Sequence, residues 1–205
     1  MDAVAIINSG FGNLRNLCRG VRLAGCEPRI LERPDGLEDF SHVILPGVGA
    51  FPKAMEALNK LGFSDKLKGL VADKRITLLG VCLGMQLLAD ESEEAGGAKG
   101  LGLIPGKVVF LEPTEEKEPV PHVGWNELYY DEGHDLLADV PSGKDFYFVH
   151  SLSFYPGNPD SAIATTPYCG EFVSVVGKGM VMGTQFHPEL SSHHGIQILR
   201  NFLAM

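Results

Sequence analysis

Several features that would assign a protein to a class at once are missing from this sequence. No stretch reaches about 18 consecutive apolar residues, so no segment is expected to span a membrane. There is no basic run, and 17 basic against 26 acidic residues give a net charge of −9, which argues against binding to a nucleic acid backbone. The N-terminus lacks the basic region and cleavage site of a signal peptide.

Cysteine is scarce and scattered, which weakens two further readings. The chain has 4 cysteines and no C-x-x-C pair, so neither a redox motif nor a zinc site is indicated; they are Cys18, Cys26, Cys82 and Cys169. Thiols without an export signal fit a reducing cytoplasm. His193 and His194 near Glu189 suggest a metal only weakly, because no further ligands complete the set. We therefore expect no metal and no organic cofactor.

The first half of the sequence alternates short apolar runs with amphipathic stretches. The apolar runs predict strands over Val4–Ile7, Arg29–Leu31, His42–Leu45 and Ile76–Val81. The amphipathic stretches predict helices over Asn13–Leu23, Pro52–Leu61, Ser64–Asp73 and Leu83–Ala89, the third with Ser64 as its N-cap. Strands that alternate with helices at this spacing predict an α/β fold with a mainly parallel central sheet flanked by helices.

The second half reads mainly as strands separated by glycine, proline and aspartate. These strands are predicted over Lys107–Leu111, Asn126–Tyr130, Phe146–Val149, Ala162–Thr165, Glu171–Val176 and Val181–Gln185, before a last helix over His194–Leu203. We expect them to add antiparallel strands to the central sheet. No repeat, linker or low-complexity segment interrupts the chain, so residues 1–205 are predicted to form one three-layer domain.

The sharpest chemical feature is the segment Leu79–Met85, in which an apolar strand runs through Gly-Val-Cys-Leu-Gly into a helix. This is the context of a nucleophile elbow, with Cys82 at the position where hydrolases carry serine. A helix N-terminus favours the thiolate, and the Leu83 N–H is placed to stabilise an oxyanion. The alternative is a buried structural cysteine beside a glycine-rich turn.

Two other segments match the needs of such a nucleophile. His187 and Glu189 lie two residues apart on an extended segment and so project from one face, as a general base and the carboxylate that orients it. Leu45–Gly49 ends a strand with two glycines that free its amides to form an oxyanion hole, although an ordinary turn explains it equally well. His122 and His150 lie among aromatic residues, where packing is the simpler explanation.

These motifs resemble a known family. Gly80–Gly84 with His187–Glu189 resembles the triad class of glutamine amidotransferases. Within that class, four further segments resemble the glutaminase subunits of imidazole glycerol phosphate synthase: Pro46–Phe51, Gly84–Leu88, His122–Asn126 and Tyr147–Ser151. The resemblance runs in order from Ile6 to Phe202. It departs at Leu190, where relatives commonly have lysine, and in the loop Asn8–Asn13.

The resemblance implies a role for each matching position. Cys82 would be the nucleophile, His187 the general base and acid, and Glu189 the orienting carboxylate. Gly47, Val48 and Gly49 would form an oxyanion strand that rearranges before its amide points inward. The substrate glutamine would be held by Gln86, Glu94, Ser151 and Leu152, and a partner would be faced by Asn13, Asn16, Arg19, Trp125 and Tyr147.

The resemblance also implies the reaction and the partner. Glutamine would be hydrolysed to glutamate and ammonia, and a (β/α)8 barrel cyclase in a heterodimer would receive the ammonia. From PRFAR this partner would form imidazole glycerol phosphate and an aminoimidazole carboxamide ribotide, in histidine biosynthesis.

Three other functions remain open from the sequence. A paralogous amidotransferase subunit would feed a different synthase, for example one that aminates a sugar. A stand-alone cysteine γ-glutamyl hydrolase would be strongly active without a partner. A scaffold with a relic elbow would not react with a glutamine-analogue electrophile at Cys82.

Overall fold

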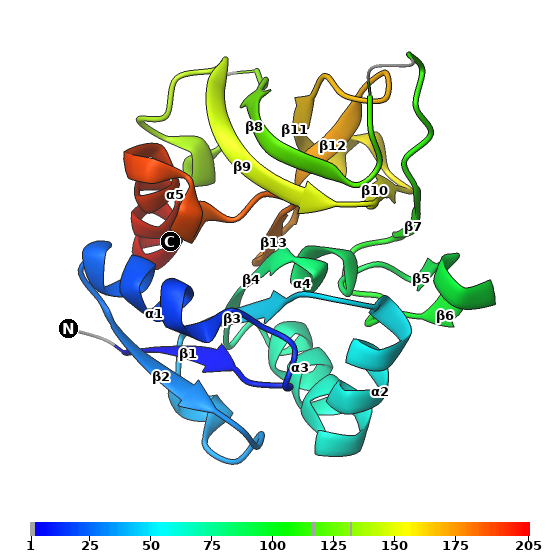
Figure 1. The fold of residues 1–205 in the computed structure, drawn as a ribbon. Helices are drawn as coiled ribbons and strands as arrows, with labels where there is room; N and C mark the ends of the chain where they lie inside the picture. The colour runs from blue at the N-terminus through cyan, green and yellow to red at the C-terminus, as the bar shows by residue number, and fades with distance from the viewer. Residues whose placement is uncertain (1–2, 116–117, 132) are drawn as a thin grey trace.

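A central parallel sheet forms the core of the computed structural model, which describes residues 3–115, 118–131 and 133–205. Its strands lie in the order β2 (Glu27–Leu31), β1 (Ala3–Ile7), β3 (His42–Gly47), β4 (Thr77–Cys82) and β13 (Val181–Thr184) (Figure 1). Each neighbouring pair in this order is parallel. The predicted α/β architecture with a mainly parallel centre is therefore confirmed.

Helices cover both faces of this sheet and give three layers (Figure 1). One face packs on α2 (Phe51–Leu61) and α3 (Phe63–Ala72), and the other packs on α1 (Leu14–Leu23) and α5 (Ser192–Ala204). The alternation along β1 explains this arrangement, because successive side chains of a strand point to opposite faces. Ala5 and Ile7 join the first apolar cluster, whereas Val4 and Ile6 join the second.

Antiparallel strands extend the sheet beyond β13, as predicted for the second half. They follow in the order β12 (Phe172–Lys178), β10 (Leu152–Pro156), β7 (Gly106–Phe110), β5 (Glu91–Ser92) and β6 (Ala98–Lys99), with β11 (Ala162–Thr166) paired to β12 and only β5 parallel to β7. A separate two-stranded ribbon, β8 (His122–Leu128) with β9 (Lys144–His150), arches over this part (Figure 1). Among the described residues, no helix is long and apolar enough to cross a membrane.

Two expectations about helices differ from the structure. Ser64 does not cap a helix: α3 begins at Phe63, directly after Gly62, whose φ of +83° ends α2. The helix predicted over Leu83–Ala89 is the single turn α4 (Leu83–Gln86). It stops there because the carbonyls of Leu87 and Ala89 accept N–H groups from the following loop, at 2.9 and 2.8 Å, instead of continuing the helix.

Candidate active site

Cys82 lies on a sharp turn between β4 and α4, as the sequence predicts. Its φ of +56° is unusual for a residue with a side chain, and such strain concentrates at functional sites. Two glycines make the turn possible. A Cβ on Gly84 would overlap the carbonyl oxygen of Leu45 in β3, and one on Gly80 would come 2.7 Å from the N atom of Met85. The turn that carries Cys82 therefore packs directly against the backbone of β3.

His187 follows β13, the strand next to β4 in the sheet. Its Nδ1 lies 2.9 Å from Oε1 of Glu189, and the two side chains are only 6% and 3% exposed. Its other ring nitrogen, Nε2, is buried and has no hydrogen-bond partner among the described residues. Burial lowers the pKa of His187, but Cys82 and then Glu189 outweigh burial and raise that pKa to about 10. The thiol of Cys82 therefore lies close enough to the His187 ring to affect its pKa.

A pocket of about 390 Å³ opens in front of Cys82. It brings together most of the predicted site residues: Val48, Gly49, Cys82, Leu83, Gln86, Glu94, Ser151 and Leu152. Phe110, Pro121, Val149 and His150 complete its wall. These residues come from separate parts of the chain, so the fold brings together groups that lie far apart in the sequence. Gly47, His187 and Glu189 are not among the residues that line this pocket.

The predicted oxyanion strand leads away from the end of β3. Gly47 pairs with Cys82 across β3 and β4, and Gly49 has a φ of +100°. The N–H of Val48 donates to the carbonyl oxygen of Phe11 at 3.3 Å. This amide is therefore engaged outside the pocket, in agreement with the expected need for a rearrangement. Leu83, the other predicted oxyanion residue, is the first residue of α4 and lines the pocket.

The residues predicted to hold glutamine already make hydrogen bonds within the protein. Both N–H bonds of buried Gln86 are used inside the protein, on the carbonyl oxygen of Leu152 (3.0 Å) and on Oε1 of Gln185 (2.9 Å). Oε2 of Glu94 accepts the N–H of Phe51, the first residue of α2, at 2.7 Å. Ser151 is tied through its carbonyl to Leu111 N–H. Each residue is thus held by a hydrogen bond before substrate enters.

Three buried polar residues near the sulfur were not singled out from the sequence as site residues. Gln185 is fully buried, and its Nε2 lies 3.8 Å from Cys82 Sγ. Nδ1 of His122 and Nε2 of His150 are 3.0 Å apart. The only signals in the sequence were the Gln before Phe-His-Pro-Glu and the histidines among aromatics, and neither reveals long-range pairing.

Trp125 and Tyr147, predicted to face a partner, lie opposite each other on β8 and β9, and their rings meet edge to face with centroids 6.0 Å apart. Trp125 is 54% exposed. Asn13 caps α1, and Asn16 and Arg19 on that helix line a pocket of about 480 Å³ with Glu189 and Leu190. Both groups flank the short segment Pro188–Leu190, which contacts α1 and β9. No cluster of metal ligands occurs within the described residues.

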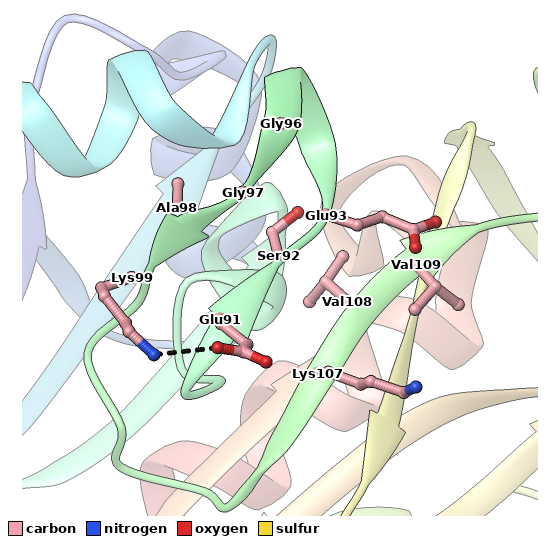
Figure 2. Close-up of a pocket in the computed structure, with 10 residues that line it drawn as sticks. All are labelled: Glu91, Ser92, Glu93, Gly96, Gly97, Ala98, Lys99, Lys107, Val108 and Val109. Carbon is pink, nitrogen blue, oxygen red and sulfur yellow. Dashed lines mark hydrogen bonds and ion pairs between the residues drawn. The ribbon is translucent and has the colours of Figure 1, made fainter.

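A third pocket, of about 640 Å³, lies between β5, β6 and β7 (Figure 2). Lys99 reaches across it to Glu91, with Nζ 2.9 Å from Oε2. Oε1 of Glu93 accepts the N–H of Phe110 at 2.6 Å. Both interactions fix the short segment that leads to Glu94, and Glu94 lines the pocket at Cys82.

Comparison with known proteins identifies the family. Residues 5–205 match the family Glutamine amidotransferase class-I. The chain is 42% identical over 200 residues to imidazole glycerol phosphate synthase subunit HisH of Chlorobaculum tepidum, covering 97% of this chain and 98% of that protein. It is 43% identical over 205 residues to HisH of Geobacillus kaustophilus, covering 98% and 96%.

Solved structures share the fold at low identity. A crystal structure of a glutamine amidotransferase has a TM-score of 0.78 at 20% identity, covering 98% of this chain and 97% of that one. The structure of PurLQS from Thermotoga maritima has a TM-score of 0.75 at 16% identity, covering 100% and 99%. Together with the near full-length identity to HisH proteins, these matches place the chain in the class-I glutamine amidotransferase family, among the HisH subunits of imidazole glycerol phosphate synthase.

Proposed function

We propose that this chain hydrolyses glutamine with Cys82, His187 and Glu189 and passes the ammonia to a (β/α)8 barrel cyclase subunit in histidine biosynthesis. One observation carries the proposal: the buried, unpartnered Nε2 of His187, on a ring held by Glu189 and coupled to a thiol on a strained elbow. A buried polar nitrogen without a hydrogen-bond partner lowers stability, and a catalytic role explains why such a group is retained.

The chemistry follows from these positions. The Cys82 thiolate attacks the side-chain amide carbon of glutamine, and the C–N bond breaks when protonated His187 gives its proton to the leaving nitrogen. Ammonia departs and a γ-glutamyl thioester remains on Cys82. Water, deprotonated by the now neutral His187, attacks the thioester and releases glutamate and the thiolate. Glu189 keeps the ring in place throughout.

The tetrahedral intermediates need two amide donors, and only one of them is in place. Leu83 N–H lies at the start of α4, beside the sulfur. Val48 N–H must leave Phe11 to serve as the second donor. One missing donor of this kind costs about 3–4 kcal/mol of transition-state stabilisation, or roughly a hundredfold or more in rate. We therefore expect weak glutaminase activity from the chain alone and strong activity once a partner turns this strand.

The partner is expected on the surface that carries Trp125. Ammonia released into water is mostly protonated and no longer nucleophilic, so it must pass directly to the subunit that consumes it. The exposed side chains of Val123, Trp125 and Val149 form an apolar patch on the outer face of the ribbon, close to the pocket that Val149 lines. A barrel cyclase seated there would receive ammonia beside Cys82. The single domain and the cytoplasmic location stay predictions.

The test compares two cysteine variants in the complex with the cyclase. Cys82→Ala should abolish glutamine-dependent synthesis and leave ammonia-dependent synthesis intact, because only the first needs the thiolate. Cys169→Ala, a half-buried cysteine outside the site, is the matched control and should keep both activities. Glutamine-dependent synthesis by Cys82→Ala would refute the mechanism. Strong glutaminase activity without any partner would favour a stand-alone hydrolase instead.

A further inference from the structure

We infer that Gln185, His150 and His122 are positioning residues for Cys82, joined in one continuous chain of hydrogen bonds that starts on the β8–β9 ribbon and ends at the sulfur. The inference deepens the proposed function and rests on Cys82 as the nucleophile. None of the three residues is needed to break or form a bond with glutamine. Their role is to hold the reacting atom through other groups.

The chain ends at the sulfur through two buried glutamines. Gln185 Nε2 donates to Cys82 Sγ at 3.8 Å, and Gln185 Oε1 accepts from Gln86 Nε2 at 2.9 Å. The second N–H of Gln86 donates to the carbonyl oxygen of Leu152 at 3.0 Å. Because Gln86 must donate twice, Gln185 is forced to present its carbonyl to Gln86 and its N–H groups to the sulfur. An N–H donor stabilises a thiolate more than a thiol.

The histidine half of the chain has one proton arrangement. The carbonyl oxygen of Leu152 can only accept, so His150 Nδ1, 2.8 Å away, must carry a hydrogen. His150 Nε2 then accepts from His122 Nδ1 at 3.0 Å. His122 Nε2 in turn accepts from Asn126 Nδ2 at 3.5 Å. A neutral pair is required, and burial lowers the pKa of His150 to about 3 and that of His122 to about 4.

Packing alone does not account for this arrangement. The His122 ring lies between Tyr168 and Phe148, with centroids 3.9 and 5.0 Å away and nearly parallel planes. A phenyl ring would fill the same space at less cost, because burying imidazole nitrogens must be compensated by hydrogen bonds. The His122 nitrogens instead contact His150 and Asn126. His150 in turn contacts the carbonyl oxygen of Leu152, which also accepts from Gln86.

The start of the chain places it under the predicted partner surface. Asn126 follows Trp125 on β8, and neighbouring residues of a strand point to opposite faces. Trp125 is therefore directed to solvent, and Asn126 to the interior, where it contacts His122. Because His122 begins β8 and His150 ends β9, a displacement of the ribbon would move Asn126 and both histidines together and, through Leu152, would act on the groups that hold the sulfur.

The experiment uses the full chain in complex with the cyclase. Gln185→Met removes the donor to sulfur, and His122→Phe keeps the stacked ring but removes both nitrogens. His134→Phe is the matched control, because His134 is a half-buried histidine whose ring accepts the N–H of Leu136, away from Cys82. The readouts are kcat and KM for glutamine, the pH dependence of Cys82 alkylation by iodoacetamide, and ammonia-dependent synthesis.

Gln185→Met should lower kcat by about tenfold or more, with KM changed by less than about threefold, and should move the alkylation midpoint to higher pH. His122→Phe should change kcat in the same direction by a smaller factor. Ammonia-dependent synthesis should be unchanged in both, and His134→Phe should match the wild type in every readout. A role in stability alone would leave the alkylation midpoint where it is.

Unchanged kcat and an unshifted alkylation profile in folded Gln185→Met would overturn the inference. If this variant does not fold, Gln185→Glu decides, because a carboxylate of the same shape cannot donate and should raise the midpoint further. Failure of the proposed function looks different: the wild-type complex itself would then lack glutamine-dependent synthesis, or Cys82→Ala would retain it. The alkylation profile reports on the sulfur in either case.

Discussion

Acidification should destabilise this protein well above the pH at which carboxylates are protonated, because His122 and His150 are buried as neutral rings. Burial lowers the pKa of His122 to about 4 and that of His150 to about 3, whereas an unfolded histidine titrates near 6.5. Above pH 6.5 both histidines are neutral in the folded and in the unfolded state, so they cause no loss of stability. Below pH 6.5 the unfolded chain binds protons that the folded chain does not bind, so the free energy of unfolding decreases as the pH is lowered.

The size of this loss follows from the separation of the two pKa values. Between pH 7.5 and 5, each of the two histidines should remove about 2 kcal/mol from the free energy of unfolding, and the pair about 4 kcal/mol. His187 acts in the opposite sense, because its pKa is raised to about 10 and the folded state keeps its proton throughout this window. His134 and His194, whose pKa values are lowered mainly by burial, add to the loss.

Urea unfolding of the wild type and of His122→Phe at pH 7.5 and 5 isolates one of these contributions. The variant keeps His134, His187 and His194, so their effects cancel in the comparison. Its loss of stability between the two pH values should be smaller than that of the wild type by about 2 kcal/mol. Equal losses in the two proteins would show that His122 is protonated in the folded state, and the single proton arrangement of the chain would be wrong.

Three further outcomes are expected. Gly84→Ala should lower the free energy of unfolding by about 3 kcal/mol or more in urea titrations, because its Cβ overlaps the Leu45 carbonyl. Trp125→Ala should change stability by less than about 0.5 kcal/mol, since the ring is 54% exposed. Calorimetry should nonetheless find its affinity for the cyclase about tenfold weaker or more. His187→Asn should reduce glutamine-dependent kcat by about three orders of magnitude while ammonia-dependent turnover persists.

Local signals were sufficient for much of the fold and for the elbow. The continuous apolar runs at Val4–Ile7 and His42–Leu45 are typical of strands buried on both faces, and both form strands of the parallel sheet. Gly80 and Gly84 are needed on either side of Cys82 because a Cβ at these positions would collide with backbone atoms of the tight turn or of β3. The pairing of β4 with β13, which brings Cys82 and His187 to neighbouring strand ends, is non-local, and no local pattern predicts it.

Other features depend on contacts that no local pattern encodes. The sequence pattern predicts no strand at β10, because Ser153 interrupts its apolar residues, although Ser153 is fully buried in the sheet. The end of α4 is set by hydrogen bonds from a loop that follows Gly100, and the α3 start is set by Gly62 rather than by Ser64. Gln185 reads as part of a strand; its contact with Cys82 exists only because β4 and β13 are neighbours.

The β8–β9 ribbon contacts the residues proposed for catalysis at more than one point. The carbonyl oxygen of Tyr147 accepts the N–H of His187 at 3.0 Å, and the N–H of Tyr147 donates to Oγ of Ser191 at 3.0 Å. The Ser191 hydroxyl in turn donates to the carbonyl oxygen of His187 at 2.6 Å. The same ribbon contacts Cys82 directly, because the carbonyl oxygen of Val149 in β9 accepts from Cys82 Sγ at 3.7 Å, and it also reaches the sulfur through His122 and His150. A partner that favours one position of the ribbon therefore acts on base and nucleophile together. Since coupling between binding sites is reciprocal, a reversibly bound glutamine analogue whose affinity is raised by the partner must tighten binding of the partner by the same factor.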